Sequence, residues 1–288
     1  MMMLRSALPY GQYWRDMRKL TMVELLSNSR LEMLTHVWDA ETKLLMKDMH
    51  EKSIKNRGHI VVEMKEKFGD LTTNIIVRVL AGKRYFGTES NGDEESRKVQ
   101  KALGGFFYLL GLFLVSDAVP FLGWLDSVRG YVGKMKRTAR EMDGVFGSWV
   151  KEHRLKRLSG SINEEEKDFI HVLLSNLDDG KISAHDTDTT IKSTCLSLVL
   201  GGHETTMVTI TWATSLLLNN RNVLEKAQDE LDIQVVHLTV ARLLHGFELA
   251  TVSDTPIDMS EGPGMTLPKA TPLEIILKPR LNSSLYEC

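Results

Sequence analysis

Apolar residues recur at intervals of three and four positions along most of this 288-residue chain, which predicts amphipathic α-helices over most of its length. The predicted helices share this spacing and end in polar or glycine-containing segments. They cover residues 8–20, 21–55, 60–80, 134–157, 168–177, 221–231 and 234–247. The sequence therefore predicts a mainly α-helical fold.

Three segments break the helical pattern. Residues 89–98 are polar and predict a surface loop, and residues 159–167 predict a solvated linker. Residues 272–277 (PLEIIL) are the best strand candidate, because they form a short apolar run that contains the β-branched pair Ile275-Ile276. A small C-terminal β-hairpin is therefore expected beside the helices.

One long helix is predicted from Ser183 to Asn220. Ser183 and Asp186 form an S-x-x-D start pattern, and Asn219-Asn220 is a plausible end. Apolar residues recur at helical spacing through the whole segment and leave few positions for solvent. This pattern predicts a helix that runs through the middle of a helical domain.

The centre of that helix, GGHETT at residues 201–206, is unusual for a core helix. Gly201 and Gly202 each cost roughly 1 kcal/mol relative to alanine, and Glu204 is a carboxylate where burial is expected. Thr205 and Thr206 can bond back to carbonyl groups and open a local bulge. Two interpretations stay open: a site where a flat ligand meets proton-carrying side chains, or a kinked core helix.

A second candidate site is the pair Trp14 and Arg18, which share one helix face at i and i+4. An indole N–H beside a guanidinium suits a carboxylate ligand, since the guanidinium is a two-pronged donor. The alternative is a surface cation–π pair. The spacing alone does not decide between them.

Composition narrows the class of protein. The chain is 42% hydrophobic and 26% charged with a net charge of −2, which is typical of one or two globular domains. Basic residues are balanced by acidic ones without an aromatic-basic stripe, which argues against a nucleic-acid partner. Only Cys195 and Cys288 are present, so no disulfide framework is expected. No metal site is predicted either, and His153 is expected to be packed or solvent-facing.

Membrane contact is expected to be peripheral. The N-terminus has no long apolar core of the kind found in a signal peptide or anchor. Residues 104–125 are the one candidate span, but Asp117 and Pro120 interrupt them and leave less than the roughly 20 apolar residues that a span needs. A buried or interfacial hairpin is predicted there.

The central hexapeptide matches the pattern [AG]-G-x-[DE]-T-[TS] and resembles the oxygen-binding helix of cytochrome P-450, a haem-thiolate monooxygenase. Residues 14–18 resemble the W-x-x-x-R helix of that family, whose Trp and Arg hold a haem propionate. Residues 234–288 are similar to the helix, loop and terminal hairpin that follow the haem-ligand loop in plant members.

This resemblance implies a haem cofactor, a small lipophilic substrate and electrons from an NADPH-dependent reductase. It also implies roles for single residues. Trp14 and Arg18 would anchor haem, Gly201 and Gly202 would make room for O2, and Glu204 and Thr205 would relay protons.

The family pattern breaks near Ile233. The segment that would hold the E-x-x-R helix, most of the β-sheet and the axial cysteine loop F-x-x-G-x-R-x-C-x-G is missing there. Glu94–Arg97 spells E-x-x-R in a predicted loop, which indicates coincidence. Cys195 and Cys288 both lie outside any ligand loop.

The sequence is thus interpreted as a plant-type P-450 remnant, truncated at its N-terminus and internally deleted. Residues 1–232, which include the oxygen-binding helix at 183–220, and residues 233–288 would be two parts of one domain. Without the axial cysteine the chain is predicted to be inactive, so whether it is an enzyme stays open. The alternative is a non-catalytic helical protein that binds an apolar ligand or partner, or a misfolded remnant. Intact relatives would be tethered to the endoplasmic reticulum, whereas this chain is expected to be cytoplasmic if expressed.

Overall fold

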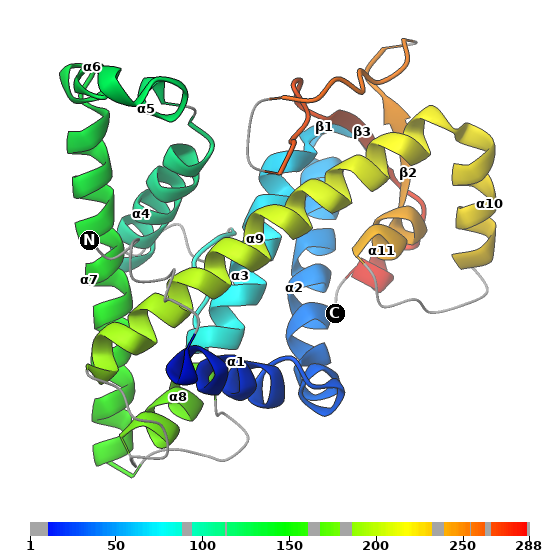
Figure 1. Cartoon of the computed structure of the whole chain (residues 1–288). Helices are drawn as coiled ribbons and strands as arrows, with labels where there is room; N and C mark the ends of the chain where they lie inside the picture. The colour runs from blue at the N-terminus through cyan, green and yellow to red at the C-terminus, as the bar shows by residue number, and fades with distance from the viewer. Residues whose placement is uncertain are drawn as a thin grey trace. The chain divides into compact units, whose positions relative to one another are not determined.

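The protein was analysed as a computed structural model, which describes residues 11–87, 94–112, 114–160, 168–178, 186–231, 239–253, 255–262 and 266–286. These residues are mostly helical, with one small antiparallel sheet (Figure 1), which confirms the predicted mainly α fold. The longer helices are α1 (Gln12–Glu24), α2 (Asn28–Lys55), α3 (Met64–Ala81), α4 (Glu94–Leu110), α7 (Tyr131–Leu158), α8 (Phe169–Leu177), α9 (Thr187–Asn219), α10 (Arg221–Leu231) and α11 (Thr239–Gly246). Shorter helical segments are α5 (Val115–Ala118), η2 (Pro120–Leu122), α6 (Trp124–Val128) and η4 (Ser283–Tyr286).

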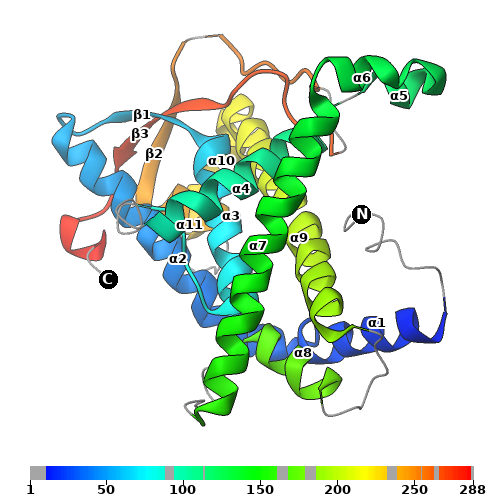
Figure 2. The same ribbon diagram turned by 90° about the vertical axis from the view of Figure 1, so that its left-hand side faces the viewer.

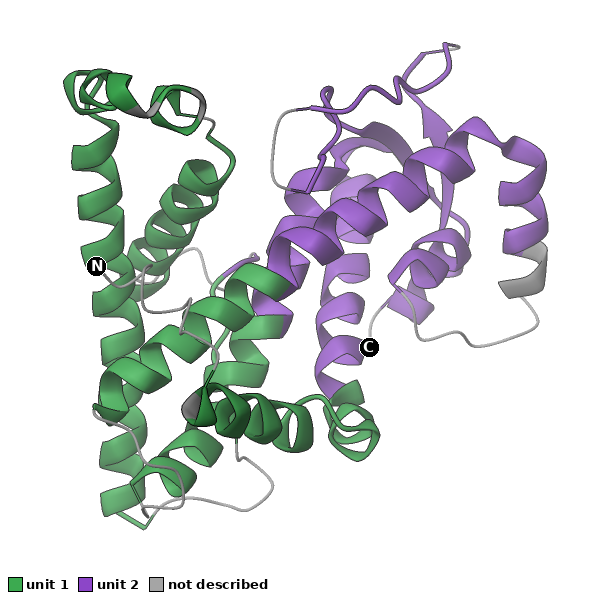
Figure 3. Ribbon diagram, in the orientation of Figure 1, with its two compact units in different colours: residues 1–35, 76–85, 90–201 green, residues 36–75, 86–89, 202–288 purple. Residues whose placement is uncertain are grey.

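The chain divides into two compact units (Figure 3). The first unit comprises residues 1–35, 76–85 and 90–201, and the second comprises residues 36–75, 86–89 and 202–288. The boundary within α9 falls between Gly201 and Gly202. The junction predicted near Ile233 lies in residues 232–238, outside the described part of the chain.

The first unit is built around α4 and α7, which lie side by side (Figures 1 and 2). Its core contains large, fully buried side chains, among them Phe146 and Trp149 at an edge-to-face separation of 5.1 Å. Such a geometry is favourable for aromatic pairs. The Trp149 indole N–H donates to the Tyr85 hydroxyl at 2.9 Å, so the buried polar end of the ring has a partner. This core fixes the C-terminal half of α7.

The second unit contains the sheet, whose strands are β1 (Ile60–Glu63), β2 (Phe247–Thr251) and β3 (Glu274–Pro279) in the order β1-β3-β2. Both pairings are antiparallel, with Leu277 opposite Ile60 on one side and Leu249 on the other. Buried residues alternate with exposed ones along β1 and β2, as expected for a sheet with one covered face. The predicted C-terminal strand is therefore confirmed as β3.

The start of the helix predicted over residues 60–80 is wrong. Residues 60–63 form β1, and α3 begins only at Met64. Ile60, Val61 and Val62 are β-branched and fit a pleated surface, where they pair with β3. A long-range partner in the last segment of the chain thus overrides the local helical pattern.

The surface loop predicted over residues 89–98 is also wrong at its end, because α4 begins at Glu94. Glu94 and Glu95 lie in the first helical turn, where negative charge is favourable, and Glu94 pairs with Lys98 at 2.7 Å. The coincidental E-x-x-R sequence therefore lies on a helix. Residues 88–93 are outside the described part of the chain.

The long central helix is confirmed as α9, which covers 33 residues. Ser183 is not among the described residues, so its capping role stays a prediction, whereas the Asp186 side chain accepts a hydrogen bond from the Thr189 hydroxyl. Every residue of α9 is α-helical, so the bulge expected at Thr205 and Thr206 is wrong. Threonine hydroxyl groups in this helix donate to the carbonyl oxygen four residues earlier. Each carbonyl oxygen has a second lone pair that can still accept the helical backbone hydrogen bond, so the helix stays continuous.

Residues 104–125 complete α4 and continue through α5, η2 and the start of α6. Among the described helices, one stretch, Glu94–Asp117, is long and apolar enough to cross a membrane by length and composition. A core helix of a soluble protein meets the same criterion, and 29% of the most apolar part of this stretch is buried.

Candidate functional site

One face of α9 carries the predicted site and is open to solvent. Ser197, Gly201, Thr205 and Thr209 are exposed and follow one another in four-residue steps, which places them on a single face. A side chain at Gly201 would meet no atom of the described structure within 4 Å. Most other residues of α9 are buried or half-buried, which agrees with the expectation of few solvent-facing positions. We call this exposed stripe the open face of α9.

The predicted proton carriers lie beside the open face. Thr205 is exposed, and Glu204 is half-buried rather than buried. The carboxylate of Glu204 accepts a hydrogen bond from the Thr266 hydroxyl at 3.0 Å. Thr266 belongs to the loop that leads to β3, a segment that the sequence did not connect with this site. The carboxylate expected to be buried is thus half-buried and has a hydroxyl partner.

His203 occupies the variable position of the hexapeptide and points to the opposite, buried side. Its Nδ1 lies 3.1 Å from the Thr72 hydroxyl and 2.9 Å from the Thr73 hydroxyl, both on α3. Burial lowers the pKa of His203 to about 4, so the imidazole is neutral at pH 7. The sequence contained a clue, since His203 is midway between the buried residues Val199 and Met207 at four-residue steps.

Trp14 and Arg18 form a cation–π pair in the first unit. The Arg18 guanidinium lies 5.2 Å from the centre of the Trp14 ring, which is the alternative that the sequence left open. Arg18 is exposed, and Trp14 is half-buried. Binding of a carboxylate by this pair stays a prediction. The pair belongs to the first unit, and Glu204 and Thr205 belong to the second.

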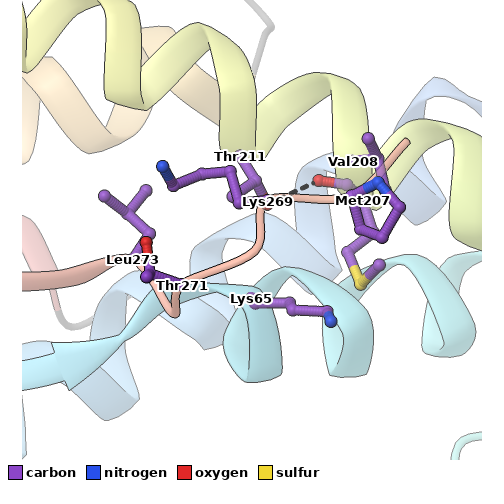
Figure 4. A pocket seen from close by; sticks show the side chains of 8 residues that line it. Lys65, Met207, Val208, Thr211, Lys269, Thr271 and Leu273 are labelled. Atoms are coloured by element: carbon purple, nitrogen blue, oxygen red, sulfur yellow. Dashed lines mark hydrogen bonds between the residues drawn. The ribbon is translucent and has the colours of Figure 1, made fainter. Parts of the chain in front are cut away.

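The second unit also contains a pocket on the buried side of α9, shown in Figure 4. Its lining residues come from α3, from α9 and from the segment before β3. They are Lys65, Met207, Val208, Thr211, Pro268, Lys269, Thr271 and Leu273. The predicted site residues are not among them, so the pocket is separate from the open face of α9.

The cysteine that the structure describes is not suited to bind iron. Cys195 is 1% exposed in the core of the first unit. Burial raises the pKa of its thiol, with the Asp168 carboxylate acting in the same direction, and the thiolate is the form that binds metals. Cys288 lies outside the described residues.

A long continuous helix with a Gly-Gly-x-Glu-Thr centre in a mainly helical fold is typical of the class of haem-thiolate monooxygenases. Comparison with known protein families agrees, since the family described as Cytochrome P450 matches residues 5–237. The chain belongs to the cytochrome P450 family. The matched region ends close to the predicted junction.

The similar proteins are plant enzymes of the same family. Strychnine-10-hydroxylase of Strychnos nux-vomica is 51% identical over 231 residues, which are 79% of this chain and 44% of that protein. Xanthotoxin 5-hydroxylase CYP82C2 of Arabidopsis thaliana is 34% identical over 402 residues, which cover 96% of this chain and 77% of that protein. Cytochrome P450 CYP82H23 of Panax ginseng is 54% identical over 187 residues, or 64% of this chain and 76% of that protein.

These alignments bear on the predicted deletion. The match to strychnine-10-hydroxylase spans less than half of that protein. The alignment with xanthotoxin 5-hydroxylase has 402 positions, more than the 288 residues of this chain, so the chain lacks residues that the relative has between matched segments. The chain is therefore a plant P450 that corresponds to only part of a full-length relative.

Proposed function

We propose that this chain is an inactive form of a plant cytochrome P450 monooxygenase, with the oxygen-side helix of the family site but without the thiolate that ligates the haem iron. The observation that supports this most directly is the burial of Cys195, because the sequence offers only Cys288 as a second thiol. Thiolate ligation favours O–O bond cleavage in this class, so a chain without it does not hydroxylate.

The remaining residues fit haem only in part. The exposed Arg18 guanidinium suits a propionate, and the open face of α9 leaves room beside Gly201. In the full-length protein Trp14 and Arg18 would anchor the cofactor, Gly201 and Gly202 would admit oxygen, and Glu204 and Thr205 would carry protons. The donor set for the iron does not fit, because a buried neutral thiol is a poor ligand. No step of the reaction is therefore assigned to this chain.

The activity of the intact relatives is the insertion of one oxygen atom from O2 into a small lipophilic molecule, supported by an NADPH-dependent reductase. The names of the relatives specify hydroxylation of strychnine and of xanthotoxin. We assign the same reaction class to the full-length protein of which this chain is a shortened form. Residues 1–232 and 233–288 are then two parts of its domain, joined across the deletion.

Membrane association is proposed for residues 104–125 and the adjoining α6. Phe121 is 81% exposed and Trp124 is 60% exposed, and large exposed apolar groups favour interfaces. Intact relatives would use such a surface at the endoplasmic reticulum. Sedimentation with phospholipid vesicles tests this contact. Trp124→Ser should reduce binding, whereas Leu158→Ser, which removes another exposed apolar side chain, should not. Equal binding of both variants and the wild type would argue against it.

The proposed inactivity is tested by NADPH consumption. The full chain is supplied with haem and a plant P450 reductase, and the rate of NADPH oxidation is compared with reductase and haem alone. We expect no additional oxidation from the chain, and Thr205→Ala should give the same rate as the wild type. A haem-dependent rate that falls in Thr205→Ala would contradict the proposal. A chain that binds no haem but keeps its helical structure would instead favour the alternative of a non-catalytic binding protein.

A further inference from the structure

A buried cluster of potential metal ligands lies in the first unit and contains none of the residues of the P450 motif. His153 comes from α7, and Asp168 and His171 come from the start of α8. Each of them offers a ligand atom, and these atoms all lie within 4.8 Å of one another. The side chain of His153 is fully buried, and those of Asp168 and His171 are 8% exposed. Three ligating groups this close and this buried require a shared explanation.

His153 is oriented as a metal ligand would be. Its Nδ1 lies 2.6 Å from the Trp149 carbonyl oxygen, which can only accept, so Nδ1 carries the hydrogen. Its Nε2 is thereby directed at the Asp168 carboxylate, 2.6 Å away. Histidines that bind metals typically donate one ring N–H to a backbone carbonyl or carboxylate and coordinate through the other nitrogen.

Asp168 is held between the two rings by its place at the start of α8. Its Oδ1 accepts from the His171 backbone N–H at 3.1 Å and lies 3.0 Å from the His171 Nδ1. Its Oδ2 contacts His153. The cap on α8 therefore fixes the carboxylate, so that its orientation does not depend on an ion.

The protein alone leaves this cluster unsatisfied. The Nε2 of His171 is buried without a hydrogen-bond partner in the described structure. An unsatisfied buried polar atom costs roughly 1–3 kcal/mol. The 2.6 Å contact between the His153 Nε2 and the Asp168 Oδ2 also brings two potential ligand atoms together in a buried place.

We propose that His153, Asp168 and His171 bind a divalent transition-metal ion, and that zinc is the ion their chemistry fits. Two imidazole nitrogens and one carboxylate oxygen are common zinc ligands, at about 2.0–2.2 Å from the ion. Tetrahedral geometry at that distance separates ligand atoms by roughly 3.3 Å. The three ligand atoms all lie within 4.8 Å of one another, so they have to shift by at most about 1.5 Å to reach that separation.

Binding replaces the proton between His153 and Asp168 with the ion, so one proton is released to solvent. A fourth position would be taken by water. Because His153 lies in the last third of α7 and Asp168 is the N-cap of α8, the ion ties these two helices together. Its role in this position is structural, and it does not depend on haem.

Cobalt titration of the full chain tests the site, since Co²⁺ takes zinc sites and reports its ligands in the visible spectrum. We expect one Co²⁺ per chain without a thiolate charge-transfer band, displaced by Zn²⁺. His171→Gln and His153→Gln should each weaken binding at least tenfold. His59→Gln is the matched control, because His59 is exposed in the second unit, and it should bind as the wild type does.

Thermal stability provides a second measurement. Zn²⁺ should raise the melting temperature of the wild type, and the rise should be lost in His171→Gln, which keeps the helix cap. Absence of a rise in the wild type, a thiolate band, or unchanged Co²⁺ binding in both histidine variants would each overturn the proposal.

Discussion

At the scale of single residues, Gly201 belongs to the functional motif but contributes nothing to the packing of the described structure. It lies in the interior of α9, where glycine is unfavourable, and a Cβ at this position would contact no described atom within 4 Å. The nearby Glu204 carboxylate accepts a hydrogen bond from the Thr266 hydroxyl, which offsets part of the cost of placing a charge in the helix centre. The cost of the motif is therefore concentrated in the glycines.

Gly201→Ala should stabilise the chain by up to about 1 kcal/mol, since the helix propensity improves without a steric penalty. Denaturant unfolding measures the change. Gly82→Ala is the contrasting variant, because Gly82 has φ of +64° and alanine is strained there. It should destabilise the chain. A loss of stability in Gly201→Ala would mean that this glycine serves close packing.

At the scale of elements, His203 links α9 to α3 within the second unit. The unfolded pKa is about 6.5, and burial lowers the folded pKa to about 4. The folded state therefore favours neutral His203. The contribution of neutral His203 to the free energy of unfolding is fully present above pH 6.5. It is lost as the pH falls from about 6.5 to about 4, by roughly 3 kcal/mol in total.

Unfolding free energies between pH 4.5 and 7.5 test this linkage. Asp70 acts in the opposite direction, because burial raises its pKa to about 6. The informative quantity is therefore the difference between wild type and His203→Gln, which keeps a hydrogen-bonding side chain but does not titrate. As the pH falls, the free energy of unfolding of the variant should rise relative to that of the wild type. A difference that is constant over this range would refute a buried neutral His203, and exposed His59→Gln should show none.

Elements with strong internal periodicity could be predicted, and those that depend on distant partners could not. The length of α9 followed from its apolar spacing and polar ends, because both are local. Strand β1 could not be separated from α3, since its pairing partner β3 is more than two hundred residues later. The motif residues at the candidate site were identified from sequence, but the contact of Glu204 with Thr266 required tertiary structure. The cluster at His153 was missed for the same reason.

At the scale of the whole molecule, several large apolar side chains of the described residues are exposed. Among the most exposed are Phe121, Val128 and Leu158 at 81%, 75% and 84%. In a full-length relative, residues absent from this chain would provide additional covering surface. Contiguous exposed apolar surface promotes association.

We expect the purified chain to bind a hydrophobic dye, to associate as its concentration rises and to unfold over a broad temperature range. Dye fluorescence, size-exclusion chromatography and calorimetry measure these properties. The expectation follows from the deletion rather than from any single residue. A sharp and cooperative transition of a monomer would show instead that the chain has repacked into a complete domain.

The central claim is that this chain belongs to the cytochrome P450 family but has no thiolate for the haem iron. The carbon monoxide difference spectrum of the reduced, haem-reconstituted protein tests it most directly. We predict a spectrum without the thiolate-type band, and the same spectrum for Cys195→Ser and Cys288→Ser. A clear thiolate-type band that disappears in either cysteine variant would contradict the claim.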